Sequence, residues 1–223
     1  MVSESKENQS AGGGRALIYI PIIHTQADMG TVADRIKSRA TQQLGQQGWE
    51  KHRGQVNQLW SEIEKLIEGL PLNFSQVRLY QDGLPVCERE SEIVRELAKA
   101  GSRNHGLLLR LMEEGATLMG AESPQLLVEE YQLLNHSLDS KATTSEEQRQ
   151  ETAALLLRKR DRYIAERINT TLGEGETGIL FLGMLHSLEG LLSSDIQLIE
   201  PLAIKRGITK ASATYRGKEH GAA

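Results

Sequence analysis

Short stretches in which nearly every position is apolar alternate along this chain with longer stretches of helical periodicity. Continuous apolar runs of this kind are typical of strands buried on both faces of a sheet. We predict strands over 15–23 (RALIYIPII), 76–85 (QVRLYQDGLP), 116–123 (ATLMGAES), 177–187 (TGILFLGMLHS) and 194–202 (SDIQLIEPL). The second strand is expected to stop at the turn signal Asp82-Gly83 and at Pro85.

Helices are predicted in the segments between these strands. From Gly30 to Gly69 apolar residues recur at helical spacing, and a break near Gly45 to Gly48 divides the segment into two helices. Start signals for later helices are Ser123-Pro124 and a capping box at 145–148. The remaining helices are expected over 93–101, 105–115, 124–134 and 145–173.

The alternation of strands and helices predicts an α/β fold. Its mainly parallel sheet of about four or five strands is expected to be covered by helices on both faces. At 223 residues the chain is long enough for one domain with a substantial core. We expect a single domain over 15–203, preceded by a disordered segment (1–14) and followed by a flexible basic tail (204–223).

Composition and charge narrow the classes of function. The net charge of -4 argues against a nucleic-acid-binding protein, which usually carries a basic face. No apolar run approaches the roughly 20 residues of a membrane span, and the first residues lack the pattern of a secretory signal. The single cysteine, Cys87, excludes an intrachain disulfide. We therefore expect a cytoplasmic protein whose partners include neither nucleic acid nor a membrane.

Ionisable side chains stand at the ends of four predicted strands. His24 ends the first, Asp82 the second, Glu122 the third and His186 the fourth. Ligands of open parallel sheets bind beyond the carboxyl ends of the strands, so these four side chains could meet there. Imidazole and carboxylate groups bind divalent metals or transfer protons. The ordinary alternatives are hydrogen-bonded histidines, a turn aspartate and a glutamate that favours a helix start.

An aspartate interrupts the apolar stripe of the last long helix. Leu157, Ile164 and Ile168 share one helical face, and Asp161 completes that stripe. A carboxylate on a buried face needs a partner, because burying an isolated charge is costly. Arg160 is adjacent in the sequence. Asp161 is therefore either part of a structural ion pair or part of a site.

For two other polar segments the favoured interpretation is an ordinary structural role. The pair Glu129-Glu130 is typical of a solvated helix face. The segment Gly101 to His105 is expected to be a helix cap and a surface turn between two helices; the alternative is that Arg103 and His105 contact an anionic substrate group.

The segment RKRDRYIAERINTTLGEGETGILFLGMLHSLEGL (158–191) resembles the TraB/PrgY pheromone-shutdown family. The resemblance rests on Arg160-Asp161 opening a helical stretch and on Gly183-x-x-His186 at the end of a strand. That family is grouped with TIKI proteases, ChaN-like proteins and erythromycin-esterase-like proteins. They have a second such motif on the first strand, which falls here on Pro21-Ile22-Ile23-His24. The chain departs from the family pattern at Pro21, Gln81 and Lys159.

The resemblance implies a divalent-metal-dependent hydrolase with peptidase-like or esterase-like activity on a peptide or other small molecule. Two neutral imidazoles and a carboxylate would leave positions open on the metal (Mn, Co, Fe or Zn) for a water of nearly neutral pKa. Glu122 or Asp82 serves as third ligand or general base, Arg160 stabilises developing negative charge, and Asp161 orients Arg160 or a ligand histidine. We assign to the metal His24, His186 and Asp82, and to catalysis Glu122, Arg160 and Asp161.

Two other kinds of function stay open. The same pocket could bind a small ligand or an anion without catalysis, which Gln81 favours because it stands in place of the family's Glu. The chain could also be an interaction scaffold that forms a homodimer through the amphipathic helices from Gly30 to Gly69.

Overall fold

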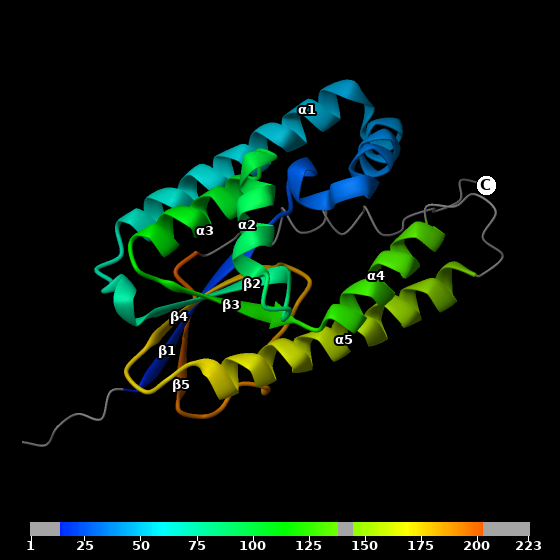
Figure 1. Ribbon diagram of the computed structural model, residues 1–223. Coiled ribbons are helices and arrows are strands. Elements are labelled where there is room, and N and C mark those ends of the chain that lie inside the picture. Colours follow the sequence, from blue (N-terminus) through cyan, green and yellow to red (C-terminus); the bar gives the residue numbers. More distant parts are fainter. Residues whose placement is uncertain (1–13, 138–144, 203–223) are drawn as a thin grey trace, which may run out of the picture.

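The computed structural model describes residues 14–137 and 145–202, and in that part of the chain it contains one five-stranded sheet (Figure 1). Neighbouring strands are parallel throughout, in the order β3-β2-β4-β1-β5. The predicted α/β fold is therefore confirmed. The segments predicted as disordered (1–14) and as a flexible tail (204–223) lie, apart from Gly14, outside the described residues. The strands are β1 (Arg15–Ile22), β2 (Val77–Pro85), β3 (Thr117–Glu122), β4 (Thr177–Gly183) and β5 (Ile196–Ile199).

Helices lie over both faces of the sheet, as predicted. One face carries α1 (Ala33–Glu68), α2 (Glu90–Lys99) and α3 (Arg103–Glu113). The other carries α5 (Glu146–Thr171), with α4 (Pro124–Ser137) packed along it as a helical hairpin that projects from the sheet (Figure 1). Two short 3-10 helices, η1 (Gln26–Val32) and η2 (Phe74–Gln76), precede α1 and β2. None of the described helices is both long and apolar enough to cross a membrane.

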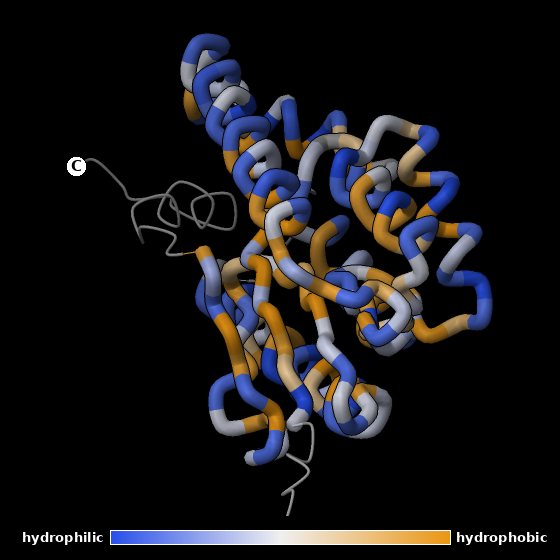
Figure 2. The backbone as a smooth tube through the Cα atoms, turned by 90° about the vertical axis from the view of Figure 1, so that its left-hand side faces the viewer, coloured by the Kyte–Doolittle hydropathy of each residue, from blue (hydrophilic) through white to orange (hydrophobic). Residues whose placement is uncertain are grey.

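The core consists of two hydrophobic clusters, one on each face of the sheet. On the first face Trp60 of α1 and Leu108 of α3 pack against strand residues such as Phe181. On the second face Ile164 of α5 packs against strand residues such as Leu180. The strands accordingly form the apolar centre of the molecule between more polar helices (Figure 2). Each fully buried large apolar side chain contributes about 1.5–3 kcal/mol to this arrangement.

The two helices predicted between Gly30 and Gly69 are present as α1, interrupted at Gly45. Gly45 has φ +69° and ψ +167°, which are not helical values, so the predicted break is confirmed. The apolar positions of its second half, among them Leu59 and Ile63, are buried in the core. The apolar face of the second half is therefore covered, whereas Leu44 in the first half is 45% exposed. The predicted capping box at Ser145 is also confirmed, because Ser145 and Gln148 bond to each other's backbone N–H groups.

The strand β2 continues through the position where the turn was expected. It runs to Pro85, and its register with β3 shifts between Gln81 and Pro85. Gly83 adopts φ +77°, a conformation that favours glycine. Asp82-Gly83 is thus an irregularity inside a strand, of the kind that redirects side chains next to functional sites. It sets the direction of the Asp82 side chain, which is only 5% exposed.

Candidate metal centre

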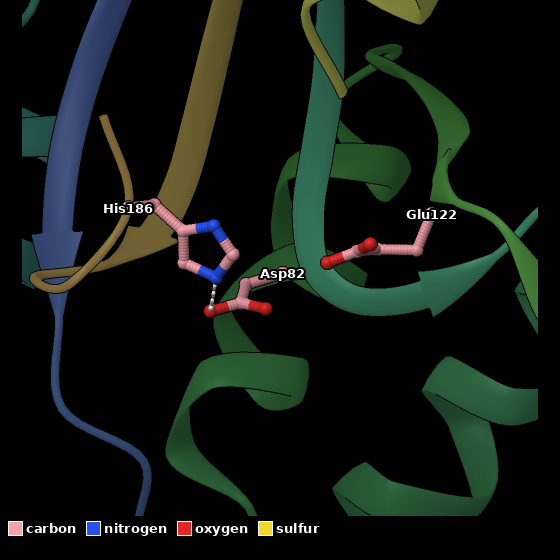
Figure 3. Close-up of side chains that lie close together, drawn as sticks. All are labelled: Asp82, Glu122 and His186. Carbon is pink, nitrogen blue, oxygen red and sulfur yellow. Dashed lines mark ion pairs between the residues drawn. The ribbon is translucent and has the colours of Figure 1, made fainter. Parts of the chain in front are cut away.

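Three ionisable side chains meet at the carboxyl edge of the sheet. Asp82 comes from the bend in β2, Glu122 from the end of β3 and His186 from the turn after β4 (Figure 3). A ligand atom of each lies within 4.8 Å of a ligand atom of the other two. The convergence of strand-end side chains predicted for a parallel sheet is thus present for these three residues.

Asp82 is the most heavily contacted of the three. Its Oδ1 accepts a hydrogen bond from Nη2 of Arg160 at 2.7 Å, and its Oδ2 accepts one from the backbone N–H of Gly183 at 2.9 Å. Nε2 of His24 lies 3.2 Å from Oδ2, and Nε2 of His186 lies 3.6 Å from it. Burial alone would raise the pKa of Asp82, but the His24 hydrogen bond and the charges of His24, His186 and Arg160 hold it well below its usual value.

The close approach of β4 to Asp82 explains why a glycine, Gly183, opens the Gly-x-x-His motif of this chain. A Cβ atom at Gly183 would lie 2.8 Å from Oδ2 of Asp82, closer than real side chains allow. Only glycine therefore lets the β4 backbone approach near enough to donate its N–H to Asp82. The turn that follows is closed by a hydrogen bond from the His186 N–H to the Gly183 carbonyl, which brings the imidazole back over the strand end.

His186 is held by Asp161, the aspartate that interrupts the buried apolar face of α5. Nδ1 of His186 lies 2.6 Å from Oδ1 of Asp161. With the proton on Nδ1, this contact leaves the lone pair of Nε2 on the side of Asp82. A carboxylate behind a histidine in this way fixes the ring orientation and the tautomer that metal binding requires. Of the two contacts considered for Asp161 from the sequence, the structure therefore provides the one with the histidine.

Arg160 connects the carboxylates through a buried guanidinium. Its Nε lies 3.2 Å from each oxygen of Glu122, and its Nη2 lies 2.5 Å from Oε1 of Glu122. Burial would lower the pKa of Arg160, but the hydrogen bonds with Glu122 and the charges of Asp82, Glu122 and Glu130 raise it above its usual value. Glu122 differs from Asp82, because burial outweighs Arg160 and leaves the pKa of Glu122 raised.

Glu130 of α4 is the residue that the sequence analysis missed. Its Oε2 lies 2.6 Å from Nη1 of Arg160, so the interpretation of this residue as part of a solvated helix face is wrong. The signal was present, because Glu130 lies between Leu127 and Leu134 at helical spacing, just as Asp161 interrupts the stripe of α5. The cause of the contact is the hairpin packing of α4 on α5, which one sequence does not reveal.

His24 stands beside this group without belonging to it. Its imidazole is 35% exposed and contacts Asp82, but the described cluster with mutual distances within 4.8 Å comprises Asp82, Glu122 and His186. Burial would lower the pKa of His24, but the hydrogen bond with Asp82 raises it. Side chains alternate along a strand, and Leu79 and Tyr80 of β2 belong to the hydrophobic clusters on opposite faces of the sheet. Gln81 therefore lies on the same face as Leu79, away from the cluster of Asp82, Glu122 and His186.

The donor set and its charge fit a divalent cation. Two carboxylates and an imidazole with one lone pair facing inward are ligands that Mn, Fe, Co and Zn accept. Four carboxylates lie around one guanidinium and one imidazole here: three contact Arg160 and the fourth contacts His186, which leaves an excess of negative charge beside the single arginine. The four are Asp82, Glu122, Glu130 and Asp161.

Another buried carboxylate, that of Asp28 in η1, contacts the start of α3. Ser102 caps that helix by accepting a hydrogen bond from the His105 N–H at 3.2 Å, and its hydroxyl donates to Asp28. The predicted helix cap is thus confirmed, and Gly101 before it is exposed in a turn, whereas Ser102 and His105 are buried. Burial alone would raise the pKa of Asp28, but hydrogen bonds from His105, Ser102 and Thr25 lower it to about 2.

Replacing Asp28 by asparagine is expected to remove a pH-dependent part of the stability. The lowered pKa means that ionised Asp28 stabilises the fold above the unfolded value of 3.8, and that this contribution is lost as the pH falls towards 2. Asp28→Asn should lower the free energy of unfolding by about 2 kcal/mol at neutral pH. Urea denaturation of both proteins between pH 7 and pH 3 should show the difference shrinking below about pH 4. A constant difference would contradict this assignment.

Comparison with known proteins adds no relative to this picture. No family model matches the chain, and neither a curated protein nor a solved structure is significantly similar to it. The resemblance to the TraB/PrgY family therefore remains a prediction from the sequence.

Proposed function

We propose that this chain binds a divalent metal ion through Asp82, Glu122 and His186 and hydrolyses a peptide or an ester with it. The observation that carries the proposal is the mutual approach of these three ligand groups within 4.8 Å at the carboxyl edge of a parallel sheet. Compared with the set assigned from the sequence, Glu122 takes the place of His24 among the ligands.

The surrounding residues have separate tasks in this proposal. Asp161 keeps the proton on Nδ1 of His186, and the Gly183 N–H holds Asp82 in place. Arg160 spans the two ligand carboxylates and keeps them at a fixed separation. A bound divalent ion would supply a Lewis acid and a water of lowered pKa. His24, at the exposed side of Asp82, would line the approach of the substrate.

The first test of this proposal is metal content. Untagged protein loaded with Mn, Co, Fe or Zn and then dialysed is expected to retain about one ion per chain. His186→Ala should lower the affinity for the metal ion about tenfold to a hundredfold or more, because it removes a ligand. His136→Ala is the matched control, since His136 is an exposed histidine of α4. Elemental mass spectrometry and calorimetric titration give the two readouts.

The outcomes separate metal binding from hydrolysis. Absence of metal from the loaded wild type, or equal affinity in wild type and His186→Ala, would contradict the metal site. If metal is retained, a screen of peptides and esters should give turnover that His186→Ala abolishes and His136→Ala preserves. Retained metal without turnover of any substrate would leave a binding protein.

A second candidate is a ligand-binding protein without metal, and one observation favours it. Arg160 donates hydrogen bonds to both proposed ligand carboxylates and so already places a positive charge between them. In that case the cluster is a closed ion network, and a small anionic ligand would bind at the exposed imidazole of His24. Wild type would then retain no metal, and its melting temperature would rise with a carboxylate or phosphate ligand but not with divalent ions.

A further inference from the structure

The outer face of α5 carries a charge pattern that mirrors itself about its own centre. Two acidic residues are followed by two small or apolar residues and then by two basic residues, and all six are exposed. The intervals between them along the helix read four, three, one, three and four residues, which keeps them on one face. We call this set the α5 stripe: Glu147, Glu151, Ala154, Leu155, Arg158 and Arg162.

The α5 stripe is unfavourable for a helix that stands alone. Like charges four residues apart on a helix repel each other. The stripe contains two such pairs, Glu147 with Glu151 and Arg158 with Arg162. In the part of the chain that the structure describes, none of these four side chains forms an ion pair or a hydrogen bond. The helix dipole explains acidic residues in the first turns, but it does not explain the arginines, because α5 continues to Thr171.

Pairing with a second copy in the antiparallel direction would turn this repulsion into attraction. A two-fold axis between Ala154 and Leu155 places Glu151 opposite Arg158 of the second copy and Glu147 opposite Arg162 of the second copy. The symmetry repeats both contacts, so that four ion pairs flank a small apolar centre. We propose that this chain forms an antiparallel homodimer through the α5 stripe.

The surroundings of Leu155 suit this partner. Leu155 is 55% exposed although it is a large apolar residue, and it lines an open groove of about 510 Å³ between α4 and α5. The hairpin projects from the sheet, so that two copies can approach along α5 (Figure 1). A contact between two helices is small, and small interfaces form weak complexes. The dimer should therefore depend on protein concentration, and on salt because its specificity is ionic.

This surface lies on the helix that also carries the metal-centre residues Arg160 and Asp161. They face inward from the same turns whose outward side carries Arg158 and Arg162. In the dimer the second copy would therefore contact this part of α5 on its outward side. The proposal does not depend on the presence of a metal ion.

Charge exchange across the stripe gives a direct test with the full-length protein. Sedimentation velocity should show wild type passing from monomer to dimer as its concentration rises. Glu151→Arg alone, and Arg158→Glu alone, should each remain monomeric, because each places like charges opposite each other in both symmetric contacts. An equimolar mixture of the two single variants should associate, since every contact between unlike copies then joins opposite charges. The double variant Glu151→Arg/Arg158→Glu should also regain the wild-type dimer.

Several results would overturn the proposal. One is wild type that stays monomeric at the highest soluble concentration. Another is a dimer that both single reversals leave unchanged, which would place the interface elsewhere. A third is failure of the mixture to associate while the circular dichroism of both variants matches wild type. Leu155→Gln provides an independent check, because it should weaken the dimer without changing any charge.

Discussion

Arg160→Met is expected to lower the free energy of unfolding by about 3–5 kcal/mol, because it removes one partner of a buried ion network and leaves the others uncompensated. The guanidinium of Arg160 is 4% exposed and contacts Asp82, Glu122 and Glu130. Methionine preserves much of the aliphatic volume, so the loss would be mainly electrostatic. Urea denaturation at neutral pH, with circular dichroism as the probe, measures it.

The matched control is Arg95→Met, which makes the same replacement at an exposed position of α2. Its effect should stay within about 0.5 kcal/mol. A loss below about 1 kcal/mol in Arg160→Met would mean that the carboxylates tolerate one another without the guanidinium. That would remove the argument from excess charge for a cation at this place.

Added divalent metal makes the same variant informative about the proposed site. A cation that binds only the folded state raises the free energy of unfolding in proportion to the logarithm of its concentration. If Asp82 and Glu122 are ligands, Mn or Zn should recover part of the stability lost in Arg160→Met. The stability of the double variant Arg160→Met/His186→Ala should respond much less. Equal responses of the two proteins would indicate that the metal binds elsewhere.

The fold could be predicted from the sequence because its strands are apolar along their whole length. Runs such as GILFL in β4 have few alternatives to burial in a parallel sheet, and glycines end several helices. The strand order β3-β2-β4-β1-β5 could not be predicted. It depends on contacts between segments far apart in the chain, such as β1 with β4.

The candidate site was predicted in part, for reasons that differ from residue to residue. Asp82, Glu122 and His186 were found because strand ends of a parallel sheet meet at one edge. Asp161 was found from its place on an apolar stripe, and the same rule applied to α4 would have found Glu130. That Glu122 rather than His24 completes the cluster depends on distances of a few ångströms. The bend in β2 at Gly83 sets those distances, and the sequence suggested a turn there.

Gly183→Ala is expected to damage the metal centre from the backbone side. The added methyl group would lie 2.8 Å from Oδ2 of Asp82, so the carboxylate would have to move. This movement would break the hydrogen bond of 2.9 Å that the Gly183 N–H donates to Oδ2. Leaving a buried donor and a buried carboxylate poorly paired costs about 1–3 kcal/mol of stability. Displacing a ligand should also lower metal affinity about tenfold to a hundredfold.

A second glycine of the same strand separates these two effects. In Gly178→Ala the new methyl group would lie 2.6 Å from Cδ1 of Leu17, within the apolar core and away from the ligands. The free energy of unfolding of this variant should fall by about 1–3 kcal/mol, as in Gly183→Ala, because the core becomes overpacked. Its folded form should nevertheless bind metal as wild type does. If both variants lose metal affinity equally, the loss follows from general instability. If only Gly183→Ala loses it, the close approach of β4 to Asp82 is what shapes the site.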